Sequence, residues 1–212
     1  MNNRLDVICH LDPRSHLTCL RALVVALIVS GTSVTGAAVI TFDSISEGSY
    51  SPGTTIGTEA GYTLTAAPSG TGNLLVGTPY SPTGNGIAQE SWPESPILQI
   101  TQATIPFAFV GFDISDQLDG FPAAPVAVRG YLGGVLQATD VYDPDSPPMA
   151  TLAAVNLAGV TIDELQIEMP INEFAYVNID NVELIPEPSS ATLISCAFAL
   201  PLFYRRRRLF RQ

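Results

Sequence analysis

The side chains that could take part in chemistry between residues 39 and 188 are carboxylates, tyrosines and hydroxyls. Both histidines, His10 and His16, precede this span, the cysteines lie at positions 9, 19 and 196, and the chain has no lysine. The span therefore lacks the residues for Ser-His-Asp or Cys-His catalysis, for a Cys/His zinc site, for disulfide bonds and for Schiff-base chemistry.

Two pairs of acids, Asp116 with Asp119 and Asp143 with Asp145, are candidate glycosidase carboxylates. Glycoside hydrolysis needs two carboxyl groups roughly 5 to 10 Å apart, one of them with a pKa raised by an apolar pocket. These acids occur in the Pro- and Gly-rich segments "SDQLDGFP" and "YDPDSPP", where hydration keeps carboxylates ionised. We therefore interpret them as solvated loop acids and predict that the protein is not an enzyme.

Two aromatic residues, Tyr80 and Trp92, lie in the long polar stretch "GTPYSPTGNGIAQESWPES". Exposed rings can stack on sugar faces, and Asn85, Gln89 and Glu90 would supply hydrogen bonds beside them. The alternative, which we favour, is that Trp92 folds back to close one end of the domain, because large aromatic side chains bury much apolar area.

The charge distribution excludes nucleic acid as a partner. Arg129 is the single base between residues 39 and 188, against 18 acids, so the formal charge of this span is close to −17. The other eight arginines lie before residue 22 or after residue 204. Such a domain repels phosphate backbones.

Short extended segments separated by Gly, Pro, Ser and Asn predict an all-β domain without a sustained helical period. About ten strands in roughly 150 residues indicate a single antiparallel two-sheet β-sandwich. The predicted strands are residues 38–43, 61–66, 73–76, 97–101, 105–113, 125–132, 135–142, 151–157, 161–169 and 174–184.

Three of these segments predict finer detail. Gly133-Gly134 is a two-residue link suited to a type I′ or II′ hairpin. In "TIDELQIEM" apolar and polar residues alternate, so one face should meet the core and the other water. The segment "FAFVGF" is apolar at both parities, which predicts a central strand that is covered on both faces.

The last predicted strand changes phase. Val177 and Ile179 share one parity, whereas Val182 and Leu184 share the other. If both pairs face the core, the strand must bulge or bend at Asp180-Asn181.

The N-terminal segment has the features of a secretory signal peptide. Arg21 is followed by the apolar run "ALVVALIVS", and Gly36 and Ala38 place small side chains at alternate positions before Val39. This pattern predicts cleavage by signal peptidase near Ala38-Val39.

The C-terminal segment combines three features in order. The tripeptide Pro186-Glu187-Pro188 should be extended, because each proline restricts its own backbone torsion and that of the residue before it. An apolar run over Ala191–Tyr204 is shorter than the roughly 20 residues that a free-standing helix needs to cross a bilayer. A basic cluster that satisfies the positive-inside preference follows: Arg205, Arg206, Arg207 and Arg208.

This tail resembles the PEP-CTERM sorting signal of Gram-negative and related bacteria, which consists of Pro-Glu-Pro, a hydrophobic segment and a terminal basic cluster. The resemblance implies export, processing by a membrane-embedded exosortase, and delivery to the cell envelope, outer surface or extracellular matrix. A plain tail anchor is the alternative.

The segments "ITFDSI", "VGFDI" and "NIDNVEL" together resemble the jelly-roll ectodomains of PEP-CTERM proteins, which are similar to galactose-binding-like carbohydrate-binding modules. The resemblance implies that the first and last strands lie close together. It also implies a structural calcium ion between them, with Asp43 and Asp180 as ligands. The alternative is that Asp43 ends a strand in a turn and Asp180 satisfies backbone groups at the bulge.

The sequence thus predicts a signal peptide (1–38), a β-sandwich ectodomain (39–185) and a sorting signal with a short hydrophobic helix (186–212). The predicted function is that of an exported structural or adhesive protein of the envelope or matrix. The alternative is a calcium-stabilised carbohydrate-binding module with extracellular polysaccharide as its partner. Exosortase, signal peptidase and the membrane are the partners expected during processing.

Overall fold

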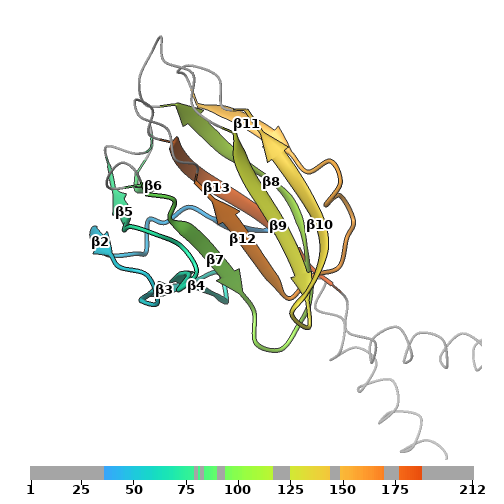
Figure 1. Cartoon of the computed structure of the whole chain (residues 1–212). Helices are drawn as coiled ribbons and strands as arrows, with labels where there is room; N and C mark the ends of the chain where they lie inside the picture. Colours follow the sequence, from blue (N-terminus) through green and yellow to red (C-terminus); the bar gives the residue numbers. More distant parts are fainter. Residues whose placement is uncertain are drawn as a thin grey trace, which may run out of the picture. The chain divides into compact units, whose positions relative to one another are not determined.

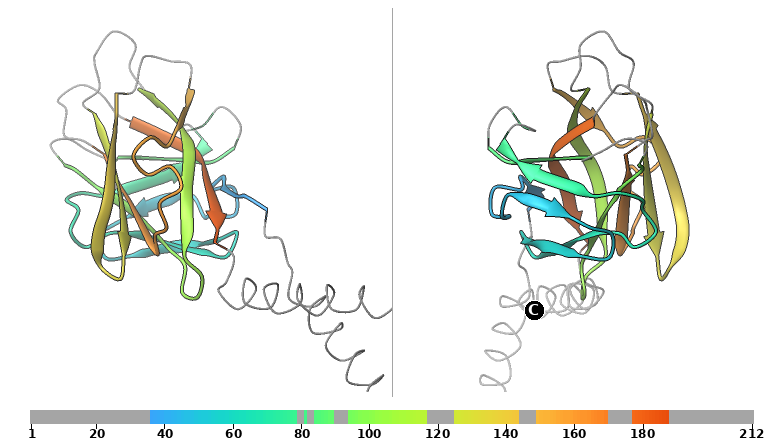
Figure 2. Two further views of the ribbon diagram at one scale, coloured as in Figure 1. Left: turned by 90° about the vertical axis from the view of Figure 1, so that its right-hand side faces the viewer. Right: turned by 60° about the vertical axis from the view of Figure 1, so that its left-hand side comes forward.

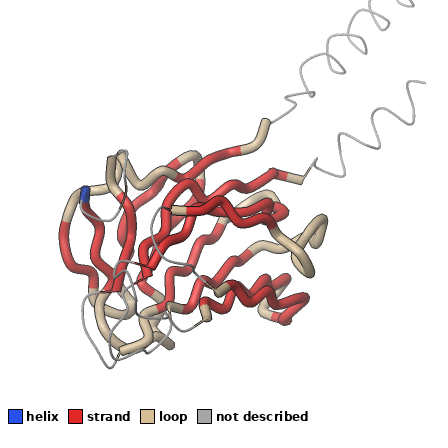
Figure 3. Tube along the Cα trace, turned by 90° about the horizontal axis from the view of Figure 1, so that it is seen from above, coloured by secondary structure: helices blue, strands red, loops and turns tan. Residues whose placement is uncertain are grey.

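The computed structural model describes residues 36–78, 81, 84–89, 94–116, 125–143, 149–169 and 177–187. All thirteen named elements in these segments are β-strands (Figure 1). They are β1 (Ala38–Ile40), β2 (Gly48–Tyr50), β3 (Thr55–Glu59), β4 (Tyr62–Ala66), β5 (Leu74–Gly77), β6 (Gly86–Gln89), β7 (Ile97–Thr101), β8 (Phe107–Asp116), β9 (Val126–Leu132), β10 (Val135–Tyr142), β11 (Ala150–Ala153), β12 (Glu164–Glu168) and β13 (Val177–Pro186). Seen from above, strands make up most of the described chain (Figure 3).

The strands form two antiparallel sheets. Sheet A has the order β11-β8-β13-β6-β5-β2, with β1 also paired to β13, and sheet B has the order β10-β9-β12-β7-β4-β3. Every paired neighbour is antiparallel. The prediction of an all-β, two-sheet sandwich is therefore confirmed.

The core lies between the two sheets and is rich in aromatic side chains. Tyr62 of β4 in sheet B meets Phe107 of β8 in sheet A edge to face, with ring centroids 5.1 Å apart. Tyr142 of β10 meets Phe112 of β8 in the same way at 5.0 Å. Such ring pairs stabilise beyond the burial of their apolar area, and both of these join β8 of sheet A to a strand of sheet B.

The two-residue hairpin and the bulge predicted from the sequence are both confirmed. Gly133 and Gly134 have φ of 58° and 76° and join β9 to β10, as a type I′ turn requires. In β13 the register against β8 shifts between Asp180 and Glu183, and Asn181 has a positive φ of 48°. The bulge allows both Ile179 and Val182 to be buried.

The apolar pattern of β8 has a different explanation from the one predicted. One residue of β8, Val110, lies between Phe109 and Gly111, whereas their partners in β13, Leu184 and Glu183, are consecutive. This second register shift lets Phe109 and Phe112 both face the core although their parities differ. The strand is interior to sheet A, between β11 and β13.

Three strands lie where the sequence predicted none: β2, β3 and β6. The sequence placed β6 within a long polar loop, but all four of its residues are buried because it pairs with β5 on one side and β13 on the other. Strand β6 is short, and nothing within the segment itself distinguishes it from a loop.

The first and last described strands pair with each other. Ala38 lies opposite Leu184, so the strand that begins the described domain runs antiparallel to the strand that ends it (Figure 2). Both chain exits therefore lie at one end of the sandwich, which we call the proximal end; the opposite end is the distal end. The described strands belong to one compact unit, Thr35–Glu187.

Candidate functional site

Three aspartates gather on the outer face of sheet A, in a group that we call the acidic corner: Asp43, Asp113 and Asp180. Strand β13 pairs with β6 before its bulge and with β1 after it, so the corner lies where β1 ends and β6 begins. Asp113 and Asp180 alternate with the buried residues Ile114 and Ile179, which places the two carboxylates on the side of the sheet away from the core.

Asp43 is held by the segment that leads into β6. Its Oδ1 accepts a hydrogen bond from the backbone N–H of Asn85 at 2.9 Å, and the Asn85 amide donates to the carbonyl of Ile45 at 3.1 Å. Phe42, just before Asp43, has a φ of 60°, and a Cβ on Gly84 would overlap the Asp43 carboxylate. A glycine at position 84 is thus required for this approach.

Asp180 is almost fully buried. Its Oδ1 accepts from the backbone N–H of Asn181 at 2.7 Å and its Oδ2 from the hydroxyl of Ser81 at 2.5 Å. Burial raises the pKa of Asp180, the two hydrogen bonds oppose this, and the charges of Asp113 and Asp43 raise the pKa further. The predicted ligand pair, Asp43 and Asp180, is therefore close enough to interact electrostatically.

Asp113 is the member of the corner that the sequence did not single out. It lies directly opposite Asp180 across the β8–β13 pair. Its Oδ1 accepts from the Thr151 hydroxyl at 2.5 Å and its Oδ2 from the Asn181 amide at 2.8 Å. The register between β8 and β13 brings Asp113 to this position, so only a correct pairing of two distant segments could have identified it.

The corner can act as a hydrogen-bonded acidic network or as oxygen ligands for a hard cation. Like charges directly opposite each other destabilise a sheet, and oxygen ligands are those that calcium prefers. Within the described ranges, however, no group of three or more His, Cys, Asp or Glu side chains is arranged to hold a metal ion. In the geometry that the structure describes, hydrogen bonds occupy both oxygens of Asp113 and both of Asp180.

The predicted sugar-contacting loop is only partly described, and one of its residues was placed wrongly. Gln89 is buried in β6, and neither the oxygen nor the nitrogen of its side chain has a hydrogen-bond partner. It cannot reach a sugar at the surface. Asn85 is used internally, as described above, and Tyr80, Glu90 and Trp92 lie outside the described residues.

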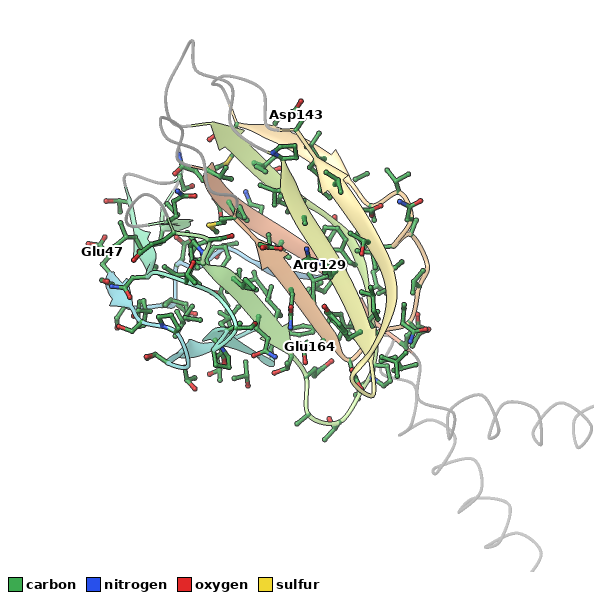
Figure 4. All side chains as sticks on the ribbon, in the orientation of Figure 1. Glu47, Arg129, Asp143 and Glu164 are labelled. Carbon is green, nitrogen blue, oxygen red and sulfur yellow. The ribbon has the colours of Figure 1, made fainter. Side chains whose placement is uncertain are left out.

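For each candidate carboxylate pair, the structure describes only one of the two residues. Asp119 and Asp145 lie outside the described residues, and only the backbone of Asp116, at the end of β8, is described. Asp143 is exposed at the distal end, just after β10 (Figure 4).

The predicted sorting motif begins inside the fold. Pro186 is buried as the last residue of β13, opposite Phe107, and the backbone N–H of Glu187 donates to the carbonyl of Pro106 at 2.8 Å. The predicted domain boundary after residue 185 therefore falls within a strand. Pro188 and the four terminal arginines, Arg205 to Arg208, lie outside the described residues.

The single base of the domain is paired. Arg129 of β9, labelled in Figure 4, lies on sheet B. It forms an ion pair with Glu168 of β12, and both side chains are about one-third exposed. Among the residues that the structure describes, no helix is long and apolar enough to span a membrane.

No family model and no curated protein match the chain. Among solved structures, it is similar to the cleaved adhesin domain of Lys-gingipain, with 15% identity over 71% of this chain and 98% of that chain and a TM-score of 0.46. It is also similar to a mutant of a family 29 carbohydrate-binding module (15% identity, 71% and 91% covered, TM-score 0.41). A third similar structure is the family 11 carbohydrate-binding module from Clostridium thermocellum, with 13% identity over 72% of this chain and 97% of that chain and a TM-score of 0.39. At these TM-scores no residue role is transferred to this chain.

Proposed function

We propose that the protein is an exported, non-enzymatic β-sandwich domain with a structural or adhesive role, held at the cell envelope or in the matrix through its C-terminal segment. The pairing of β1 with β13 carries this proposal. Because both exits lie at the proximal end, the predicted signal peptide and the predicted sorting signal join the domain at the same place. A domain attached there directs its distal end away from the attachment.

The distal end supports a role in contact with partners. The last residues of β8, β10 and β12 and the first residues of β9, β11 and β13 all lie there, because Asp116 is opposite Val177 and Tyr142 is opposite Val126. In the sequence, residues 117–124, 144–148 and 170–176 connect these strand ends. Binding residues are disproportionately found on segments that a rigid scaffold positions in this way.

Cell fractionation tests the proposal. We expect the wild type in the envelope or matrix fraction, and we expect a variant with Arg205 to Arg208 replaced by glutamine to fold but lose this placement. Arg129→Gln is the matched control, because it removes a positive charge within the domain and should leave the distribution unchanged. A cytosolic wild type, or an unchanged distribution of the fourfold variant, would contradict the proposal.

The second candidate is a calcium-stabilised carbohydrate-binding module, favoured by the proximity of Asp43, Asp113 and Asp180. In this function the corner would hold one Ca²⁺ ion between the first and last strands, and the ion would neutralise the repulsion between the opposed carboxylates. Tyr80 and Trp92, which lie outside the described residues, would supply the sugar contacts.

Calorimetry separates this candidate from the first. Titration with Ca²⁺ should release heat and raise the melting temperature of the wild type, whereas Asp180→Asn should show neither effect. Glycan-array binding that is lost in Trp92→Ala would extend the result to carbohydrate. If the wild type shows neither heat nor a shift in melting temperature, the acidic corner does not bind Ca²⁺ and the second candidate is wrong.

A further inference from the structure

Exposed apolar side chains gather at the proximal end of the domain. Of the seven large hydrophobic residues that are exposed in the described ranges, five lie there. We call these five the proximal apolar set: Val39, Leu132, Val135, Leu136 and Ile185.

A chain of backbone contacts places the β9–β10 hairpin at the same end as the chain exit. Pro186 lies opposite Phe107, and Phe107 exchanges two hydrogen bonds with Ile162 at 2.7 and 2.8 Å. The next residue, Asp163, donates its N–H to the carbonyl of Tyr131 at 2.8 Å and accepts from the N–H of Gly133 at 2.8 Å. The hairpin and the exit are thus joined through residues 162–163, and Figures 1 and 2 both show the hairpin turn at the end where β13 finishes.

The rest of the set belongs to the two strands at the exit. Val39 lies opposite Glu183, and Ile185 is two residues further along β13, so Val39 and Ile185 are diagonal neighbours on the outer face of sheet A. On the other sheet, Val135 and Leu136 are 63% and 50% exposed at the start of β10, which forms the edge of sheet B. Exposed apolar side chains that gather at one end of a domain are candidates for contact with a protein or a membrane.

The length of chain beyond Glu187 indicates which partner this end meets. Three residues separate Glu187 from the apolar run that begins at Ala191, so the two Cα atoms are at most about 14 Å apart. If the run is embedded in a bilayer, as the proposed function requires, the proximal end cannot leave the bilayer surface by more than this distance.

Charge argues against a second copy of the chain as the partner. The span 39–188 carries a formal charge close to −17, so two copies repel each other. The acids Asp163, Glu164, Glu183 and Glu187 also lie at the proximal end, with Glu164 labelled in Figure 4. They would oppose an anionic lipid surface but not a zwitterionic one.

We propose that the proximal apolar set contacts the surface of a zwitterionic bilayer and fixes the orientation of the domain on it. This inference rests on the proposed function, because the C-terminal segment must first bring the domain to the bilayer. Side chains that enter the interface are buried by about 5 to 10 Å, and the favourable free energy scales with the apolar area removed from water.

Position 141 provides a matched control for position 135. Both are valines of β10 and are almost equally exposed, at 63% for Val135 and 65% for Val141. They are six residues apart, roughly 20 Å along the strand, and Val141 lies toward the distal end, opposite Ala127. The two positions are thus similarly exposed to water and differ in the end of the domain at which they lie.

The experiment uses the full chain in phosphatidylcholine vesicles. Val135→Cys and Val141→Cys, in a background with Cys9, Cys19 and Cys196 replaced by alanine, are labelled with an environment-sensitive fluorophore. Vesicles with nitroxide-labelled acyl chains should quench the probe at 135 at least about twofold more than the probe at 141, because only a group within the interface meets the acyl region. Replacing part of the lipid by phosphatidylglycerol should reduce the difference.

Each other outcome overturns the proposal, in a distinguishable way. Protein that floats with the vesicles but shows equal quenching at both positions disproves the lipid contact and leaves the proposed function intact. Protein that does not float with vesicles at all contradicts both. Disulfide-linked dimers through Val135→Cys in lipid-free protein, absent for Val141→Cys, would identify a second copy as the occupant.

Discussion

One buried carboxylate fastens the segment that follows β11 onto β10. Asp140 accepts hydrogen bonds from the backbone N–H groups of Val155, Asn156 and Leu157 at 2.9, 2.7 and 3.2 Å, and from the Tyr142 hydroxyl at 3.2 Å. Burial alone raises the pKa of Asp140, but the three backbone donors and the hydroxyl more than offset it and hold the pKa below its ordinary value of 3.8.

We expect Asp140→Asn to lower the free energy of unfolding at pH 7 by about 2 to 3 kcal/mol, because an amide cannot accept all four bonds. Since the pKa is lower in the folded protein than in the unfolded chain, this stabilisation is complete above pH 3.8 and is lost as the pH falls through the folded-state pKa. Urea unfolding at pH 7 and in an acid series checks both points. A difference between wild type and variant that persists unchanged at the lowest pH would contradict the account.

A second buried polar group, the hydroxyl of Tyr62, has no hydrogen-bond partner, in contrast to Asp140. Tyr62 is fully buried, and burial raises its pKa to about 12. An unpartnered hydroxyl in the core retains its desolvation penalty without the compensating bond.

Tyr62→Phe should therefore raise the free energy of unfolding by about 1 kcal/mol, since the ring contact with Phe107 is kept. Tyr142→Phe is the control, because the Tyr142 hydroxyl donates to the Asp140 carboxylate or the Ala153 carbonyl. It should lower the free energy by a similar amount. Urea unfolding of both variants measures this, and effects of the same sign would show that hydroxyl partners do not govern these positions.

At the scale of the strand, the two register shifts between β8 and β13 form a matched pair. One extra residue on β13 near Asn181 is followed by one extra residue on β8 near Val110, so the strands regain their alignment. At the first shift, Asn181 donates its backbone N–H to Asp180 and its side-chain amide to Asp113, so the bulge contributes two hydrogen bonds to the acidic corner.

The bulge predicts a graded response at position 181. Asn181→Val should destabilise the domain by about 2 kcal/mol, because a β-branched residue is strained at a φ of 48° and the hydrogen bond to Asp113 is lost. Asn181→Gly loses only the hydrogen bond and should cost about half as much. Thermal melting of both variants gives the order, and a valine variant as stable as the glycine variant would rule out backbone strain.

The sequence predicted those features that depend on residues close together in the chain. The turn at Gly133-Gly134 needs only two adjacent glycines, and the bulge of β13 follows from the parity of four apolar residues. Strand β6 and the role of Asp113 could not be predicted, because both depend on pairs that β13 makes with segments about 70 to 90 residues away. The second register shift, in β8, could not be predicted, because the residues of "FAFVGF" are apolar at both parities and are compatible with burial on either face of the sheet.

At the scale of the whole molecule, the end of the domain and the beginning of the predicted sorting motif overlap. Leu184 is fully buried and pairs with Ala38 of β1 and Phe109 of β8, and Pro186 and Glu187 continue these contacts. Any enzyme that releases the domain must therefore act beyond the residues that close the sandwich, or it removes part of the core.

We therefore expect the mature protein to end at or beyond Glu187. A chain that stops after Pro188 should melt like the full domain, whereas one that stops after Glu183 loses the burial of Leu184 and the end of β13, at about 2 to 5 kcal/mol or more. Leu184→Ala should show much of this loss, and its exposed neighbour gives the control, since Ile185→Ala should cost far less. Mass spectrometry of the mature C-terminus and thermal melting of the two truncated chains provide the measurements. A folded mature protein that ends before Leu184 would show that β13 closes the sandwich without its last three residues.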